Sequence, residues 1–190
     1  MTTPAPATAL SWRQMIVLAG LALALTLTQS LYLDRFSSPF KRQFNGPQDT
    51  PLQVRLDANF GDQFTLLGYD LPRSAVVAGE PLDLTLYWQA RRQQATNYSS
   101  LAQLIDGAGK VVSAQDNLHP GQYPTHLWQR WGYVTDPHRL PLPPDTPPGQ
   151  YTLLVGLYEP DTWRRLPVVN STSKQWTDAV PIGPVTIIPK

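Results

Sequence analysis

The side chains best suited to chemistry gather between residues 116 and 138. They are His119, His126, His138, Asp116 and Asp136. A metal site needs such ligands to converge at about 2 Å, with partners that orient them. The histidines are separated by seven and twelve residues, on segments that read as loops, and this spacing does not bring them together. We therefore expect solvated loop histidines and no metal site.

No other group of residues has the pattern of a reaction centre. The sequence has no cysteine, no serine in a nucleophile elbow and no glycine-rich phosphate loop after a strand. Acidic pairs such as Asp57 with Asp62 fit scattered surface acids better than a general acid and base. We predict that the protein is not an enzyme and that it needs no cofactor.

Four aromatic residues fall within one connection, residues 119–136, that two prolines and a glycine make irregular. They are Tyr123, Trp128, Trp131 and Tyr133. Exposed rings can stack on the apolar face of a sugar or anchor a protein partner, whereas buried rings belong to the core. The core alternative applies above all to Trp128, and the three interpretations stay open.

The elements that must position these residues are strands at short, regular spacing. We predict strands at residues 52–56, 64–70, 74–77, 82–90, 99–106, 110–115, 130–140, 150–158, 163–168 and 185–188. The same region has no convincing helix. This pattern predicts an all-β fold over residues 52–190, an immunoglobulin- or fibronectin-like antiparallel β-sandwich.

Two of these strands carry the clearest signals. Residues 82–90 alternate apolar and polar side chains, as a half-buried antiparallel strand does, and Trp88 lies on the apolar side. Residues 151–158 are largely apolar on both faces, which indicates a central strand. Residues 106–109 read Asp-Gly-Ala-Gly and predict a tight hairpin turn.

Composition restricts the class of protein. The chain has 190 residues, a formal net charge of +1 and no cysteine. This length allows one membrane segment and one domain with a substantial core. The near-neutral charge, with no basic run, argues against nucleic acid as a partner. Without cysteine there are no disulfides.

An uncharged stretch near the amino terminus predicts a membrane anchor. Residues 14–33 lie between Arg13 and Asp34 and contain no charge. About twenty apolar residues suffice to cross a hydrocarbon core of about 30 Å. We predict an amino-terminal tail at 1–13, a transmembrane helix at 14–33 and a linker at 34–51. A cleaved signal peptide with its site near Ser30 is the alternative.

Small residues recur every four positions within this segment. They form two stripes, one with Gly20, Ala24 and Thr28 and the other with Ala22, Thr26 and Ser30. An offset of two residues places the stripes on roughly opposite sides of a helix. Small stripes let neighbouring helices approach closely, which predicts a helix packed between two partners. The alternative is that small residues are simply frequent in membrane helices.

Several short motifs occur in a recognisable order. They are Leu67-Gly68-Tyr69-Asp70, Gly79-Glu80-Pro81-Leu82, Leu86-Tyr87-Trp88, Leu104-Ile105-Asp106, Tyr123-Pro124-Thr125, Leu127-Trp128, Leu140-Pro141-Leu142-Pro143, Pro148-Gly149-Gln150-Tyr151, Val155-Gly156-Leu157-Tyr158 and Arg165-Leu166-Pro167-Val168. Their order resembles the carboxyl-terminal β-sandwich attached to some bacterial membrane glycosyltransferases of family 39, especially in Chloroflexus-like bacteria. The resemblance covers roughly residues 60–170. It implies a fold and an extracytoplasmic face, and it carries no catalytic residue because the multi-span enzyme half has no counterpart here.

Two signals for orientation disagree. Arg35, Lys41 and Arg42 follow the apolar segment and only Arg13 precedes it, which by the positive-inside tendency favours a cytoplasmic carboxyl domain. The β-strand pattern of residues 52–190, by contrast, is like that of an exported β domain. We predict a single-pass protein of the bacterial cytoplasmic membrane with its β domain on the extracytoplasmic face.

Two functions fit these features. The first is a non-catalytic accessory subunit of a membrane protein complex, which predicts a broad apolar patch continuous with the helix. The second is an envelope-tethered carbohydrate-binding module, which predicts a shallow groove lined by Trp131 or Tyr133 with polar neighbours such as Gln129 and Asp136. The sequence favours the accessory subunit, with other membrane subunits as partners and carbohydrate as the alternative ligand.

Overall fold

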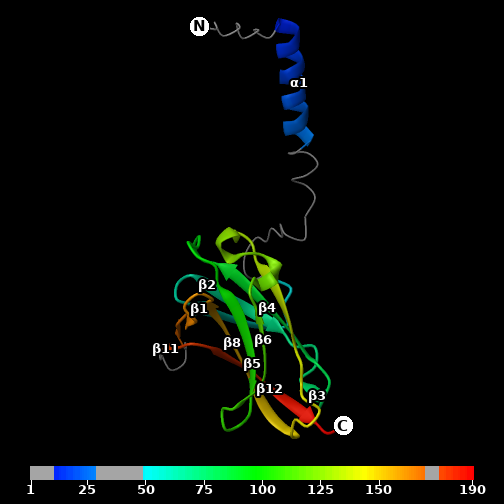
Figure 1. Ribbon diagram of the computed structural model, residues 1–190, viewed down its shortest axis with the longest axis vertical. Coiled ribbons are helices and arrows are strands. Elements are labelled where there is room, and N and C mark those ends of the chain that lie inside the picture. The colour runs from blue at the N-terminus through cyan, green and yellow to red at the C-terminus, as the bar shows by residue number, and fades with distance from the viewer. Residues whose placement is uncertain (1–10, 29–48, 170–175) are drawn as a thin grey trace, which may run out of the picture. The chain divides into compact units, whose positions relative to one another are not determined.

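The chain forms two compact units in a computed structural model (Figure 1). They comprise Met1–Lys41 and Arg42–Lys190. The structure describes residues 11–28, 49–169 and 176–190.

In the first unit, the described residues form one helix, α1 (Trp12–Thr28). Ser11 and Gln14 cap its start, because the Gln14 N–H donates to Ser11 Oγ at 3.4 Å and the Ser11 N–H donates to Gln14 Oε1 at 2.9 Å. The rest of the helix is rich in leucine and alanine, which favour helix formation. The side chains of residues 12–26 are all exposed.

Part of the predicted transmembrane segment is thus helical. Among the described residues, however, no helix is at once long enough and apolar enough to cross a membrane. Residues 29–33 of the predicted segment lie outside the described residues, and so does Ser30 of the second small stripe. The membrane span therefore stays a prediction. The other small residues of the two stripes lie on α1.

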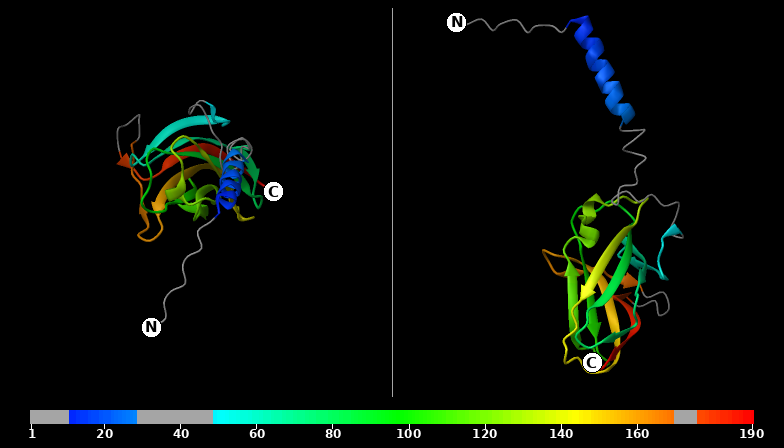
Figure 2. Two further views of the ribbon diagram at one scale, coloured as in Figure 1. Left: turned by 90° about the horizontal axis from the view of Figure 1, so that it is seen from above. Right: turned by 90° about the vertical axis from the view of Figure 1, so that its right-hand side faces the viewer.

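The second unit contains two mostly antiparallel sheets that face each other as two layers (Figure 2). In order, the first sheet contains β11 (Trp176–Thr177), β10 (Val168–Val169), β1 (Val54–Phe60), β2 (Phe64–Asp70), β4 (Leu82–Ala90) and β7 (Val134–Leu140). The second contains β3 (Ala75–Val77), β12 (Val180–Ile188), β8 (Gly149–Glu159), β5 (Ser99–Ile105) and β6 (Val111–Asn117), with β9 (Arg164–Arg165) paired to β8. The prediction of an all-β sandwich is confirmed.

The core lies between the sheets, and the two strands with the clearest sequence signals both contribute to it. Every second residue of β4 from Leu82 to Trp88 is at most 1% exposed. β8 lies centrally in its sheet, between β12 and β5, and buries residues on both faces. The Trp88 ring also meets Phe60 edge to face, with centroids 5.2 Å apart. The predictions that Trp88 lies in the core and that β8 is central are confirmed.

The tight turn between β5 and β6 also agrees with the sequence. The Gly109 N–H donates to the Asp106 carbonyl at 3.0 Å, and Asp106 Oδ1 accepts from the N–H groups of Ala108 and Lys110, each at 2.9 Å. Gly109 has φ +82°, a conformation that favours glycine.

Several strand limits differ from the prediction for physical reasons. β1 extends to Phe60, beyond the predicted end at residue 56. The prediction ended too early because a bulge between Arg55 and Ala58, with Asp57 at φ +54°, interrupts the alternation of side chains. β12 begins at Val180 although it contains two prolines, and its register shifts between Ile182 and Val185.

The predicted strand at 130–140 begins only at Val134. The residues before it form an irregular connection with two short 3₁₀ turns, η3 (Pro120–Gln122) and η4 (Thr125–Leu127). The predicted strand at 163–168 is split into β9 and β10.

We expect Trp88→Ala to lower the free energy of unfolding by about 3–5 kcal/mol, the usual cost of removing a buried large aromatic ring. Denaturant unfolding of the full chain, followed by the β-type circular dichroism signal, measures this change. Trp163→Ala is the matched control because Trp163 is 72% exposed. A loss below about 1 kcal/mol for Trp88→Ala would contradict this assignment of the core.

Candidate ligand-binding surface

The four aromatic residues of the β6–β7 connection have different environments. Trp128 is buried and meets Phe64 edge to face, with centroids 5.5 Å apart. Its Nε1–H donates to the Tyr123 carbonyl at 2.9 Å, and Tyr123 is itself partly buried against the core. The structure therefore places Trp128 in the core and Tyr123 at the edge of the core.

The other two aromatic residues lie at the outer side of the first sheet. Tyr133 is half-buried, with its ring 6.0 Å from that of Tyr87. Trp131 is 63% exposed, which is unusual for so large an apolar side chain. Of the four predicted residues, Trp131 offers the most open ring to a ligand.

Trp131 lines an open depression of about 640 Å³. Thr65 of β2 and Gln89 of β4 are directly paired across neighbouring strands and contribute polar side chains to it. Gln89 Nε2 donates to the Arg130 carbonyl at 2.9 Å, which ties the segment that carries Trp131 to the sheet. The remaining lining residues are Asp62, Ala90, Arg91 and Arg130.

The charged groups of this depression are not paired with one another in any described contact. Arg91 Nη1 donates to Thr65 Oγ1 at 3.4 Å, a long hydrogen bond. Asp62 Oδ1 instead accepts from Asn59 Nδ2 at 2.7 Å. Within the described part of the chain, no ion pair joins Arg91 or Arg130 to a carboxylate. The depression therefore offers guanidinium donors beside an exposed indole.

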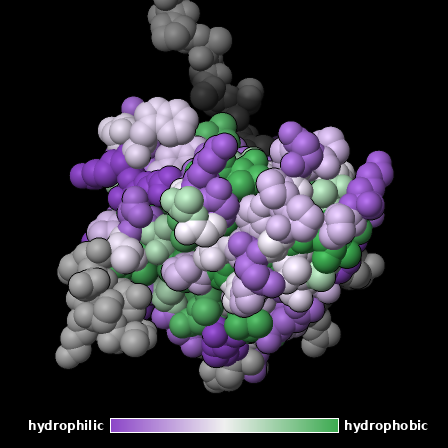
Figure 3. Space-filling model, turned by 90° about the horizontal axis from the view of Figure 1, so that it is seen from below, coloured by the Kyte–Doolittle hydropathy of each residue, from purple (hydrophilic) through white to green (hydrophobic). Residues whose placement is uncertain are grey.

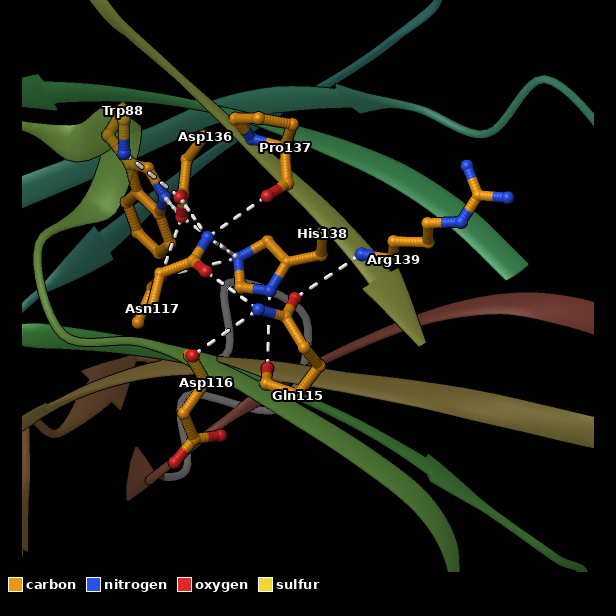
Figure 4. A network of polar contacts seen from close by, with 10 residues as sticks. Trp88, Gln115, Asp116, Asn117, Asp136, Pro137, His138 and Arg139 are labelled. Atoms are coloured by element: carbon orange, nitrogen blue, oxygen red, sulfur yellow. Dashed lines mark hydrogen bonds and ion pairs between the residues drawn. The ribbon is translucent and has the colours of Figure 1, made fainter. Parts of the chain in front are cut away.

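The base of the β6–β7 connection is held by a buried carboxylate, that of Asp136 on β7 (Figure 4). Its two oxygens accept five hydrogen bonds. The donors are Ser100 Oγ at 2.6 Å, Asn117 Nδ2 at 2.6 Å, His138 Nε2 at 2.9 Å, the Gly121 N–H at 3.0 Å and Trp88 Nε1 at 3.2 Å. These residues come from both sheets and from η3, so the carboxylate joins the two layers to the connection.

His138 is the buried ring that faces this carboxylate. Its Nε2 faces Asp136, and its Nδ1 lies 3.2 Å from the Gln115 carbonyl oxygen. Nε2 also lies 3.2 Å from Ser100 Oγ, so the ring is held from several sides. The expectation that all three histidines are solvated loop residues is therefore wrong for His138. Residues two apart on a strand point the same way, so Asp136 and His138 both face the interior.

The network contains a serine, a histidine and an aspartate but is not arranged for nucleophilic attack. Ser100 is buried; its hydroxyl donates to Asp136 Oδ2 at 2.6 Å and also lies 3.2 Å from His138 Nε2. His119 is exposed, and His126 Nδ1 lies 2.8 Å from Asn97 Oδ1. No three metal-binding side chains converge among the described residues. The Asp136 network therefore has a structural role, because it joins the two sheets through buried side chains.

Gly121 reaches the carboxylate because it has no side chain. Its φ is +64°, and a Cβ at this position would lie 2.3 Å from Val134 Cγ1 and 2.7 Å from the Thr135 carbonyl oxygen. The close approach lets the Gly121 N–H donate to Asp136. This contact anchors the start of the connection that presents Trp131 at its other end.

Sequence reasoning missed most of the depression. It named Trp131 and expected Gln129 and Asp136 as polar neighbours, but Asp136 is buried and Gln129 does not line the depression. The actual polar residues come from the β1–β2 turn, β2, the end of β4 and Arg130. The sequence offers one local signal, the adjacent pair Arg130 and Trp131.

Comparisons with known proteins show no family. No family model matches the chain, and no curated protein matches it. One similar solved structure is a beta-glucuronidase from glycoside hydrolase family 2, with TM-score 0.39 and 12% identity over 61% of this chain. The match spans only 11% of that enzyme. Another is the C-terminal domain of Wzt, with TM-score 0.41 and 10% identity over 74% of this chain and 80% of that one. At these values neither similarity indicates a function, and the resemblance to glycosyltransferase-attached sandwiches stays a prediction.

The electrostatics of Asp136 predict how stability depends on pH. Burial alone would raise the pKa of Asp136. The hydrogen bond and the coulombic interaction with His138, and the hydrogen bonds from Ser100 and Asn117, instead hold this pKa below its usual value. The unfolded state, with a carboxyl pKa of about 3.9, therefore binds the proton more readily. The stability that the carboxylate contributes is present above about pH 4 and is lost as the pH falls through the lower, folded pKa.

We expect Asp136→Asn to lower the free energy of unfolding by at least about 2 kcal/mol at pH 7, because the amide nitrogen cannot accept a hydrogen bond and each buried donor left unpaired costs about 1–3 kcal/mol. The free energy of unfolding of the variant should also fall less steeply than that of the unmodified chain as the pH drops below about 4, because the carboxyl group that titrates there has been removed. Denaturant unfolding between pH 2.5 and 7 measures both effects. Asp83→Asn is the control, because Asp83 forms only an exposed pair with Arg139 at 3.7 Å. Equal losses in the two variants would contradict the role given to Asp136.

Proposed function

We propose that this protein is a non-catalytic saccharide-binding protein and that the glycan binds in the depression beside Trp131. The observation that carries this proposal is the exposed indole of Trp131 in an open depression whose other lining residues are mostly polar. Sugars present apolar C–H faces and polar hydroxyl edges. They therefore suit a site that combines an aromatic ring with hydrogen-bonding side chains.

The lining residues provide both kinds of hydrogen-bonding partner. Arg91 and Arg130 donate, Asp62 accepts, and Gln89 and Thr65 each contain donor and acceptor groups. The depression is open and not an enclosed cavity, which suits part of an extended oligosaccharide. Because Gln89 holds the Arg130 backbone, the segment carrying Trp131 requires little ordering when a ligand binds.

The accessory-subunit function has less support from the sandwich. Its large exposed apolar residues lie on separate elements and include Val54, Val111, Leu118, Leu127, Trp163 and Ile188. On the face in Figure 3, hydrophobic areas are small and interrupted by polar side chains. The observation that favours this second function lies in α1, whose small residues at positions 20 to 26 are exposed.

We further propose that α1 anchors the protein to a membrane, with the β domain on the extracytoplasmic face. Leu18, Leu21 and Leu25 lie on one side of the helix and Ile16 and Leu23 on the other, and all five are 52% to 70% exposed. A helix that is apolar all round needs a nonpolar environment, which lipid or partner helices provide. Anchoring and glycan binding together describe an envelope-tethered carbohydrate-binding module.

We expect Trp131→Ala to abolish retention of oligosaccharides by the full chain, because the stacking surface is removed. Binding of the detergent-purified protein to an immobilised panel of neutral and acidic oligosaccharides measures this effect. Trp163→Ala is the matched control, since Trp163 is also exposed but does not line the depression. Two results would contradict glycan binding at this site. The unmodified chain could retain no oligosaccharide, or the Trp131→Ala variant could retain as much oligosaccharide as the unmodified chain.

We expect the full chain to remain in the membrane pellet after extraction with alkaline carbonate. Replacing Ala22 and Leu25 by arginine should release it, because each arginine at the centre of a membrane helix costs about 2.5–3.5 kcal/mol of insertion free energy. Ala22→Leu is the control and should stay in the pellet. Release of the unmodified chain by carbonate would contradict the anchor.

A further inference from the structure

We propose that the ligand of the Trp131 depression is an anionic saccharide, one with carboxylate or sulfate groups, and that Arg91 and Arg130 recognise its charge. This inference rests on the proposed saccharide-binding function and specifies its ligand class. The charged lining residues are two arginines and one aspartate, so their formal charge is 2 − 1 = +1. A neutral glycan would not require this excess of positive charge.

The single acid of the depression is already engaged. Asp62 Oδ1 accepts from Asn59 Nδ2 at 2.7 Å, and the Asp62 N–H donates to Asn59 Oδ1 at 3.0 Å. This reciprocal pair holds Asp62 within the β1–β2 turn, where its φ is +56°. No described ion pair links it to either arginine. Among the described residues neither guanidinium group has a carboxylate partner, so both are available to an anion from outside the chain.

The two arginines come from separate segments that the sheet brings to one depression. The backbone of Arg91 is held at the end of β4, where its N–H donates to the Gln63 carbonyl at 2.9 Å. Arg130 precedes Trp131, and its carbonyl accepts from Gln89 Nε2. Both backbones are thus tied to the first sheet, while both side chains remain exposed.

The chemistry of arginine selects for oxyanions. A guanidinium group has five N–H donors and no acceptor, and its planar fork matches a carboxylate or sulfate. The indole of Trp131 supplies a stacking surface for the sugar ring that carries the charge. Together these groups recognise a charged sugar and not a hydroxyl-only one.

Matched pairs of oligosaccharides test this inference. One pair is tetragalacturonate and its fully methyl-esterified form, and the other is isomaltotetraose with and without sulfate groups. Members of each pair share their rings and linkages and differ in charge. We expect the full chain in detergent to bind the charged member of at least one pair at least about 10-fold more tightly, because only that member forms charge-assisted hydrogen bonds with the two arginines. This preference should weaken as salt is added.

Substitution of the arginines separates recognition of charge from recognition of sugar. Arg91→Gln and Arg130→Gln should each weaken binding of the charged member about 10-fold and change binding of the neutral member less than about 2-fold. Arg92→Gln is the matched control, because Arg92 is an exposed neighbour that does not line the depression. Unchanged thermal unfolding of each variant would show that the fold is intact.

The outcomes distinguish this inference from the proposed function. Equal, Trp131-dependent binding of charged and neutral members would overturn the inference and leave saccharide binding in place. Equal weakening by Arg92→Gln and the two depression variants would show nonspecific attraction and would also overturn it. Retention of no oligosaccharide, on these pairs or on the wider panel, would overturn both.

Discussion

The structure depends on keeping one buried carboxylate ionised. An isolated charge is costly in a protein interior, so the Asp136 carboxylate is stable there only with a full set of hydrogen-bond donors. Those donors come from β4, β5, β6, β7 and η3, which places both sheets and the irregular connection in one hydrogen-bonded network. The network therefore specifies where the connection begins and where it ends.

This constraint explains why an irregular segment can present an ordered surface. Asn117 precedes the β6–β7 connection and Asp136 follows it, and the two are hydrogen-bonded. Between them Trp128 is buried in the core and Trp131 faces outward beside Gln89 and Arg130. One aromatic ring fixes the connection to the core, and the other is available to a ligand.

The sequence predicts the fold better than it predicts the surface. β2 and β4 agree with prediction residue for residue, because an apolar run and a regular alternation are local signals. β1 and β12 were misjudged because a bulge and two prolines disturb these signals. The role of His138 depends on Ser100, Gln115 and Asn117, and the depression combines residues from position 62 to position 131. Such contacts follow from strand pairing and not from local sequence pattern.

The most direct test follows the six tryptophans of the chain during titration with a ligand. The full chain would be labelled with 5-fluorotryptophan, and each ¹⁹F resonance would be assigned by single Trp→Phe substitutions. We predict that the charged oligosaccharide of a matched pair shifts the Trp131 resonance in proportion to occupancy and leaves those of buried Trp88 and Trp128 unchanged. Saturable binding without a shift of the Trp131 resonance, or with the main shift at Trp163, would contradict the account.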